Sequence, residues 1–261
     1  MFDGNPAAGR IGGAAAAAAD CPAASADQRA CDLNAQYGDQ PAAALIQLML
    51  CQVFRDRIAL VSSFGTGSAV LLDLVAKVNP ATPVLFLDTG NLFAETLRYR
   101  DALAARLGLT DIRVLRPDAW SLDAEDRDGE LWRVDASRCC YLRKVLPLTC
   151  GLQRFDAWIT GRKRFQGGER GGLTTIESDN GGKVKINPLA NWTPADISTY
   201  FVAHDLPRHA MQADGYPSIG CAPCTGQAKA WEAPRAGRWR HTVKTECGIH
   251  GRSFHAAGNC R

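Results

Sequence analysis

Two adjacent cysteines, Cys139 and Cys140, and a spaced pair, Cys221 and Cys224, most constrain what this chain can hold. Four thiolates from two parts of a chain form a sulfur site that suits zinc or an iron–sulfur cluster. Zinc sites usually pair two spaced knuckles, because the spacing lets both side chains of a knuckle reach one ion without strain. Adjacent cysteines fit the separate iron corners of a [4Fe–4S] cube better. The pattern therefore favours a [4Fe–4S] cluster, with zinc second and ordinary buried cysteines as the remaining alternative.

The overall composition is that of a folded protein with a small net charge. The chain has 261 residues, of which 46% are hydrophobic, and it is long enough to bury a full core. A net charge of +3 is too small to argue for a nucleic-acid partner. Ten cysteines without a credible secretion signal indicate reduced thiols in the cytoplasm. Apolar runs stay below the ~18–20 residues that span a bilayer, so we expect no membrane segment.

The amino-acid composition and the hydrophobic pattern change twice along the chain. Residues 1–40 are rich in Ala and Gly and poor in large apolar groups, which predicts a flexible, low-complexity tail. Residues 41–210 carry regular hydrophobic patterns and are predicted to form a nucleotide-binding α/β domain. Residues 211–261 hold Pro, Gly, His, Arg and Trp with little periodicity, so we expect an irregular, mobile C-terminal segment.

Short apolar runs alternate with amphipathic stretches through the central part of the chain. This alternation predicts a doubly wound, mostly parallel α/β sheet. The Gly-rich residues 167–182 are expected to form a mobile flap, and a helix from 138 is expected to halt near Pro147. Strands are predicted at 57–63, 83–87, 112–115, 155–160 and 183–186, and helices at 42–54, 70–78, 93–107, 138–148 and from Thr193.

The first two strands are followed by stretches that suit nucleotide binding. Phe64-Gly65-Thr66-Gly67-Ser68 lies between a strand and a helix, where backbone N–H groups can bind phosphate, although a plain tight turn fits as well. Asp88-Thr89-Gly90 follows the second strand. Carboxyl ends of parallel strands are where open α/β sheets bind ligands, so Asp88 could hold a ribose or an adenine amine. Capping of the next helix is an equal alternative.

Cations and a thiol complete the set of candidate groups. Arg162, Lys163 and Arg164 directly follow the strand at 155–160, and they form an anion site or else a solvated basic loop. Cys247 has Lys244 three residues before it and His250 three after it. Nearby cations favour the reactive thiolate, so Cys247 is a candidate nucleophile, with a spectator cysteine as the alternative. Cys51 and Cys150 are expected to be core residues.

Together these motifs resemble those of the assimilatory adenylyl-sulfate reductases, in the iron–sulfur branch of the sulfonucleotide reductase family. The resemblance covers roughly residues 41–255. It includes the strand-end motifs, the four cluster cysteines, Arg143-Lys144, the stretch from Gly161 to Gln166, and Glu246-Cys247-Gly248-Ile249-His250. It implies the fold of the PP-loop ATP-pyrophosphatases, also called adenine-nucleotide alpha-hydrolase-like. The loop after the first strand lacks the aspartate of that pattern, which argues against ATP pyrophosphate chemistry.

The resemblance implies a reaction and a set of residues. Cys247 attacks the sulfur of adenosine 5′-phosphosulfate (APS) and displaces AMP, and thioredoxin then releases sulfite from the cysteine S-sulfonate, for sulfate assimilation and cysteine biosynthesis. Cys139, Cys140, Cys221 and Cys224 hold a [4Fe–4S] cluster. The implied substrate-binding residues are Ser62, Ser63, Phe64, Gly65, Asp88, Thr89, Gly90, Lys144, Arg162, Lys163, Arg164, Arg235, Arg238 and His250.

Three alternatives remain open at this point. The 3′-phosphorylated donor (PAPS) could be the substrate, with Arg113, Arg116 or Arg170 binding its extra phosphate. The chain could instead be a cluster-containing PP-loop tRNA sulfurtransferase, although its modest charge and altered loop speak against this. It could also be a non-enzymatic iron–sulfur sensor in which Cys247 is incidental. A homo-oligomer is possible in each case.

Overall fold

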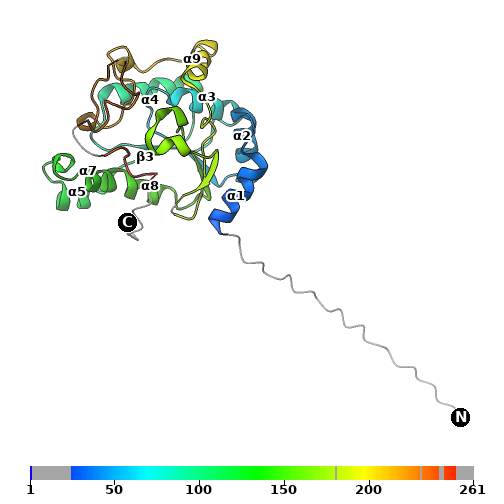
Figure 1. Cartoon of the computed structure of the whole chain (residues 1–261). Helices are drawn as coiled ribbons and strands as arrows, with labels where there is room; N and C mark the ends of the chain where they lie inside the picture. Colours follow the sequence, from blue (N-terminus) through cyan, green and yellow to red (C-terminus); the bar gives the residue numbers. More distant parts are fainter. Residues whose placement is uncertain (2–24, 180, 230, 241–243, 251–261) are drawn as a thin grey trace.

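The protein is built on a six-stranded sheet, seen in a computed structural model that describes residues 1, 25–179, 181–229, 231–240 and 244–250 (Figure 1). The strand order is β3-β2-β1-β4-β6-β5, and β5 pairs antiparallel with β6 whereas the other pairs are parallel. The order reverses between β1 and β4, which is where open α/β sheets form a ligand crevice. The strands are β1 (Ile58–Ser62), β2 (Val84–Leu87), β3 (Ile112–Leu115), β4 (Ala157–Ile159), β5 (Ile176–Ser178) and β6 (Val184–Ile186).

Helices cover both faces of the sheet, so the predicted doubly wound fold is confirmed (Figure 1). Alternate side chains of a strand point to opposite faces. Leu60 accordingly joins the larger core cluster, whereas its neighbour Ala59 joins the smaller cluster on the other side. The larger cluster packs under α2 (Ala42–Leu48), α3 (Ser68–Val78), α4 (Ala94–Leu107) and α9 (Pro194–Ala203), and the smaller one under α8 (Leu146–Gly151).

The N-terminal region contains a helix that the sequence analysis missed. Residues 1–40 were predicted to be a loose tail, but α1 (Ala26–Tyr37) is helical and packs against β5. Its Asn34 Oδ1 accepts a hydrogen bond from Ile176 N at 2.9 Å. The helix therefore covers the outer edge of the sheet and satisfies an edge-strand donor, which explains why a mostly polar segment is ordered. Residues 2–24 of the predicted tail lie outside the described residues.

The helix that carries Cys139 and Cys140 is longer than predicted. Helical backbone runs from α7 (Ala136–Cys140) through a π-helical turn, η2 (Tyr141–Val145), into α8, so the expected stop at Pro147 is wrong. In the π turn, Leu146 N donates to Tyr141 O, five residues back. This widened turn makes room for Pro147 in the first turn of α8, where its missing N–H costs little. The preceding stretch forms α5 (Ala119–Glu125) and α6 (Leu131–Val134).

The remaining segments are mostly short turns. Residues 167–182, predicted to be a mobile flap, contain the 3₁₀ turn η4 (Gly168–Gly172) and strand β5. The other 3₁₀ turns are η3 (Arg164–Gln166), η5 (Ala210–Gln212) and η6 (Ala222–Cys224). Cys51, in the π turn η1 (Met49–Val53), is exposed and Cys150 is disulfide-bonded, so neither is a plain core residue. None of the described helices has the length and apolarity needed to cross a membrane.

Candidate active site

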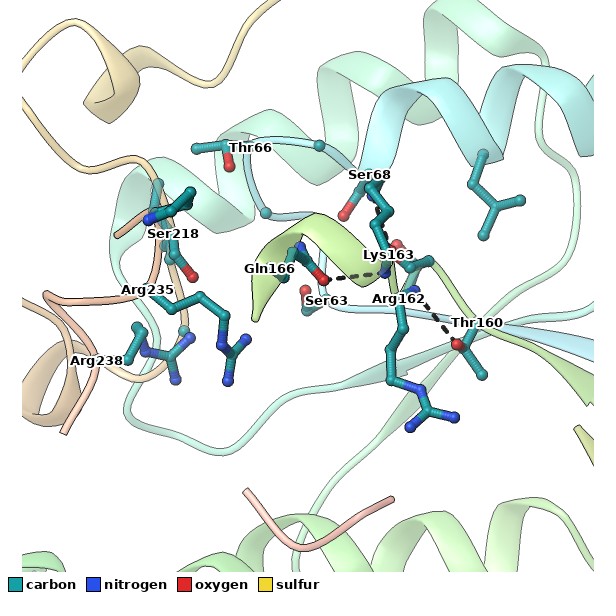
Figure 2. Close-up of a pocket in the computed structure, with 18 of the residues that line it drawn as sticks. Ser63, Thr66, Ser68, Thr160, Arg162, Lys163, Gln166, Ser218, Arg235 and Arg238 are labelled. Carbon is teal, nitrogen blue, oxygen red and sulfur yellow. Dashed lines mark hydrogen bonds between the residues drawn. The ribbon is translucent and has the colours of Figure 1, made fainter. Parts of the chain in front are cut away.

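A cavity of about 480 Å³ lies where β1, β2 and β4 end, at the reversal of strand order. This volume is typical of a small-molecule site. Arg235 and Arg238 from the C-terminal segment face Arg162 and Lys163 from the sheet across it (Figure 2). The structure thus brings widely separated motifs to one place. The predicted residues that line the cavity are Ser62, Ser63, Gly65, Thr89, Lys144, Arg162, Lys163, Arg235, Arg238, Cys247 and His250.

The loop after β1 exposes the N-terminus of α3 to the cavity. Phe64 has a positive φ of 48°, and its fully buried ring meets Phe86 edge to face at 5.4 Å. Phe64 therefore anchors the loop in the core and does not line the cavity, which corrects its predicted role in substrate binding. The N-cap of α3 is Gly67, which has no side chain to cap the helix. Ser68 N, the first N–H of α3, already donates to the Gly65 carbonyl at 3.0 Å, so the N–H groups that could bind an anion are those of the residues after it.

The loop after β4 supplies two buried cations. Lys163 Nζ donates to the Gly161 carbonyl at 2.8 Å, and burial, assisted by Arg170, lowers the pKa of Lys163 to about 8. Arg162 pairs with Glu177, and burial likewise lowers the pKa of Arg162 to about 10. Its Nε is buried without a hydrogen-bond partner. Both pKa values fall because positive charges are held away from water, and an anion in the cavity would relieve this cost.

Lys144 lies among thiols. It is buried in η2, and burial by itself would lower its pKa, but the thiols of Cys221, Cys247 and Cys140 outweigh burial and raise it. Burial also opposes ionisation of Cys221, yet its pKa is lowered, because Lys144 and the Thr89 hydroxyl stabilise the thiolate. Thr89 Oγ1 lies 3.2 Å from Cys221 Sγ. The lysine is thus an ammonium held between the thiols and the cavity.

The four predicted cluster cysteines share one neighbourhood. Cys139 and Cys140 are buried in α7, and each interacts electrostatically with Cys221. Cys224 interacts with Cys221 in turn. Burial raises the pKa of Cys139 to about 12 and that of Cys140 to about 11. The segment with the second pair is tied to the β2–α4 loop, because Ala222 N donates to the Asn91 carbonyl at 2.7 Å.

The arrangement of these thiols bears on which group they could hold. Within the described part of the chain, no three His, Cys, Asp or Glu side chains are arranged to hold one metal ion. The donor set is nevertheless all sulfur and comes from two buried segments that approach one another, which fits the chemistry of an iron–sulfur cube. A cube spreads its sulfur ligands over four separate irons, so the thiols need not converge on a single ion.

The segment with Cys247 is held against the cavity by an ion-pair bridge. The Glu246 carboxylate accepts from Arg170 Nε at 2.5 Å and from Arg170 Nη2 at 2.9 Å, and it lies 3.1 Å from Arg235 Nη2. Burial would raise the pKa of Glu246, but these arginines outweigh it and lower the pKa. Cys247 is half-buried beside this bridge and lines the cavity. Lys244 Nζ lies 3.1 Å from Oγ of Ser137 in α7.

His250 is not a cation in this structure, although the sequence analysis counted it among the charged groups. Burial lowers its pKa well below the ordinary value of 6.5, and nearby cations, Arg162 and Lys185 first among them, lower it further. Its ring stacks on Trp158 with 5.4 Å between the ring centroids, and its Nδ1 is buried without a partner. The residue therefore contributes a neutral imidazole to the wall of the cavity.

Three more predicted residues lie outside the cavity lining. Asp88 pairs with Arg116 at 3.1 Å and accepts a hydrogen bond from Gly90 N at 3.2 Å. It does not cap the next helix, because the N-cap position of α4 is Phe93. Arg164 Nε donates to the Leu173 carbonyl at 2.6 Å, so its charge points away from the other two cations of its motif. Gly90 is likewise absent from the lining.

Several residues of the site were not among those predicted to bind APS, and Arg170 was considered only for the extra phosphate of PAPS. Arg170 and Glu246 line the cavity and pair with each other, and Trp158 supports His250. Gln166 Oε1 accepts from Arg170 Nη1 at 2.5 Å. Glu246 directly precedes the candidate nucleophile, so its place in the motif was a usable signal. Arg170 and Trp158 carry no local signal, because only the folded chain brings them to Glu246 and His250.

Comparison with known proteins identifies the family. Residues 57–227 match the phosphoadenosine phosphosulfate reductase domain, and the chain belongs to this family. It is 47% identical over 222 residues to the adenosine 5′-phosphosulfate reductase of Mesorhizobium japonicum (strain LMG 29417 / CECT 9101 / MAFF 303099), covering 85% of this chain and 87% of the relative. It is 39% identical to the phosphoadenosine 5′-phosphosulfate reductase of Gloeobacter violaceus (strain ATCC 29082 / PCC 7421), covering 88% and 98%. The resemblance to sulfonucleotide reductases is thus confirmed.

A solved structure supports the fold. The phosphoadenylyl-sulfate reductase of Candida auris, in a phosphate complex, superposes with a TM-score of 0.64 at 24% sequence identity. The match covers 76% of this chain and 97% of that one. It confirms the predicted α/β fold.

Proposed function

We propose that this chain reduces APS to sulfite and AMP, with Cys247 as the nucleophile. One observation carries the proposal: Cys247 lines the same cavity as the loop between β1 and α3. The cations Lys144, Lys163 and Arg238 line this cavity as well. A nucleotide phosphosulfate needs a helix N-terminus or fixed cations for its charge and a nucleophile at its sulfur. The Mesorhizobium japonicum relative, which is named adenosine 5′-phosphosulfate reductase, supports the same substrate.

The chemistry follows from these groups. The Cys247 thiolate attacks the sulfur of the sulfuryl group, the bond from sulfur to the bridging oxygen breaks, and AMP departs with that electron pair. The products are AMP and a cysteine S-sulfonate, Cys–S–SO₃⁻. Cations around the cavity stabilise the negative charge that develops on the leaving phosphate. The neutral ring of His250, stacked on Trp158, closes one wall and excludes water from the thiol.

A dithiol donor completes the reaction, and we propose thioredoxin in this role. One donor thiolate attacks Cys247 Sγ, sulfite leaves with the electron pair of the S–S bond, and a mixed disulfide forms. The second donor thiol resolves this disulfide, restores the Cys247 thiol and leaves an oxidised donor. The dithiol thus supplies the two electrons of the reduction. The segment with Cys247 must leave the cavity for this step, because a protein donor needs an exposed sulfur. We also propose that the protein is cytoplasmic, because that compartment keeps thiols reduced.

We further propose that Cys139, Cys140, Cys221 and Cys224 hold a [4Fe–4S] cluster. The support is their common buried neighbourhood beside Lys144. A bound cluster would supply negative charge and a fixed anchor next to this lysine, and electron transfer through it is not required. The negative charge of the bound cluster would then help to hold the Lys144 ammonium in place beside the phosphosulfate of the substrate.

The cation inventory favours APS over PAPS. Of the three arginines considered for a 3′-phosphate, Arg113 pairs with Asp111 at 2.6 Å and Arg116 with Asp88 at 3.1 Å. Arg170 pairs with Glu246. All three are therefore already neutralised by a carboxylate. Membership of the reductase family also favours this function over a tRNA sulfurtransferase or a sensor.

The proposal is tested by incubating anaerobically purified protein with ³⁵S-labelled APS. Without a reductant, the label is expected to appear on the peptide that contains Cys247, and thioredoxin is expected to release it as sulfite. The Cys247→Ser variant should form neither product. The matched control is Cys51→Ser, which removes an exposed thiol in η1 far along the sequence from the site. Sulfite production at the full rate by Cys247→Ser would refute the assignment.

A further inference from the structure

The carboxylate next to the nucleophile forms a buried bridge between two segments of the site. Glu246 is 11% exposed, as is its partner Arg170, and Arg235 is 15% exposed. The contact with Arg170 is a two-pronged one, from Nε at 2.5 Å and Nη2 at 2.9 Å, which fixes direction as well as distance. A buried pair of this geometry orients its members more strongly than an exposed one.

Both arginines are themselves held in place. Arg170 sits in η4 and donates from Nη1 to Gln166 Oε1, and Gln166 Oε1 also accepts from Lys163 N at 3.2 Å. The bridge therefore continues into the loop that carries the cations of β4. Arg235 Nη2 donates to the Thr245 carbonyl at 2.9 Å, one residue before Glu246. Arg235 therefore contacts this segment both at the backbone of Thr245 and at the side chain of Glu246.

We propose that Glu246 is a positioning residue that latches the nucleophile segment onto Arg170 and Arg235 and so aims Cys247 into the cavity. This inference rests on the proposed function for the identity of the nucleophile. The latch has to open after each sulfur transfer, because the reductant needs the modified thiol exposed. Glu246 thus contributes to the attack step and opposes the release step.

The latch also divides the cations of the cavity into two groups. Arg170 and Arg235 are neutralised by Glu246 and serve the protein segment. Lys163 and Arg238 bond instead to neutral carbonyls, of Gly161 at 2.8 Å and Cys224 at 3.3 Å. Within the described ranges of the chain, these two have no carboxylate partner. They remain for the anionic substrate, so Arg235, predicted to bind substrate, is assigned here to the latch.

The test compares Glu246→Gln with a matched control from the same C-terminal segment. Glu232 also makes a two-pronged contact with Arg240, at 2.9 and 3.0 Å, but the pair is more exposed and does not line the cavity. Glu232→Gln therefore removes the same charge without touching the latch. A third variant, Arg170→Lys, keeps a cation but loses the planar fork.

The first measurement needs no nucleotide. Each protein is alkylated with a small thiol reagent, and the rate at Cys247 is divided by the rate at the exposed Cys51 of the same sample. We expect this ratio to rise about tenfold in Glu246→Gln, since loss of one partner of a buried charge pair releases the segment. A smaller rise is expected in Arg170→Lys and none in Glu232→Gln.

The second measurement separates attack from release. S-sulfonate formation from APS in a single turnover should slow about tenfold or more in Glu246→Gln, because misplacement of a reacting atom is costly. Release of sulfite from the preformed S-sulfonate by a dithiol should be as fast as in the wild type or faster. Unchanged labelling and attack rates in Glu246→Gln and Arg170→Lys would overturn the latch. Absence of S-sulfonate in the wild type would instead refute the proposed function, while the labelling ratio still reports on the latch.

Discussion

The ring of His250 lies parallel to that of Trp158, with 5.4 Å between centroids and 4° between planes. Trp158 is the middle residue of β4 and its Nε1 donates to Asp179 Oδ2 at 2.8 Å, so its ring is held in a fixed position. His250 lies three residues beyond the candidate nucleophile. Contacts on both sides of Cys247 in the sequence, at Glu246 and at His250, therefore hold this segment against the cavity. We call this arrangement the docked state of the segment.

The stack makes docking depend on pH. Burial and nearby cations hold the pKa of docked His250 well below 6.5, whereas an undocked imidazole has its ordinary value of about 6.5. Below that pH the undocked form takes up a proton that the docked form does not bind. The free energy that favours the docked segment is therefore largest above pH ~6.5 and decreases as the pH falls below this value. We expect the alkylation rate of Cys247, divided by that of Cys51, to rise between pH 7.5 and 5.5.

The matched variant for this prediction is His250→Gln, which cannot take up a proton in this range. Its alkylation ratio should be the same at both pH values. Use of Cys51 as an internal reference cancels the pH dependence that thiols share. A wild-type ratio that stays flat over this range would contradict the role assigned to the neutral imidazole.

Gly220 is predicted to be necessary for the position of Arg238. A Cβ at residue 220 would lie 2.2 Å from Arg238 Nη2 and 2.5 Å from its Cζ, so the guanidinium would have to leave its place at the cavity. Because the end of an arginine is flexible, we expect Gly220→Ala to fold normally but to raise the KM for the nucleotide about tenfold. Steady-state kinetics measures the KM of Gly220→Ala, and thermal unfolding shows whether the variant folds normally.

The control is Gly171→Ala, where an added Cβ meets no atom within 4 Å. It should leave both KM and Tm close to those of the wild type. If Gly220→Ala bound the nucleotide as well as the wild type does, Arg238 would have no part in substrate binding.

The thiols of Cys139, Cys140, Cys221 and Cys224 predict a specific metal content. Anaerobically purified protein should contain about four irons and a similar amount of acid-labile sulfide per chain. Cys140→Ser and Cys221→Ser should each lose most of this iron, and with it the brown colour, whereas Cys51→Ser should retain both. Iron and sulfide analysis, together with a visible absorption spectrum, tests whether the protein holds the cluster. One zinc per chain, or full iron in Cys140→Ser, would contradict the cluster.

The ion pairing of the arginines predicts the preferred nucleotide. PAPS brings an extra phosphate, and Arg113, Arg116 and Arg170 are already engaged by carboxylates. Placing that charge beside arginines that already have carboxylate partners is unfavourable, and we expect kcat/KM to favour APS by about tenfold or more. Rates measured on both nucleotides with the same thioredoxin give the answer. Equal values would mean that a cation outside these three binds the 3′-phosphate.

Much of the architecture could be read from local patterns. Strands and helices alternate where hydrophobic spacing says they should, and a stretch such as Val84–Leu87 is buried on both faces as a continuous apolar run requires. The N-terminal helix α1 was missed because its sequence is mostly polar, and its order depends on Asn34 meeting the edge of β5. Similarly, the turn that admits Pro147 is a π turn, which sequence spacing does not reveal.

The sequence by itself determined the class of fold and the family, and it supplied the four thiols proposed to hold the cluster and the proposed nucleophile Cys247, because each is written in short motifs or in periodic burial. Only the tertiary structure decided which charges face one another. It joined Glu246 to Arg170 across a gap of 76 residues, left Asp88 outside the cavity, and made His250 neutral by burying it among cations. The reason is physical: ion pairing and desolvation depend on distances through space, and residue spacing along a chain does not fix them.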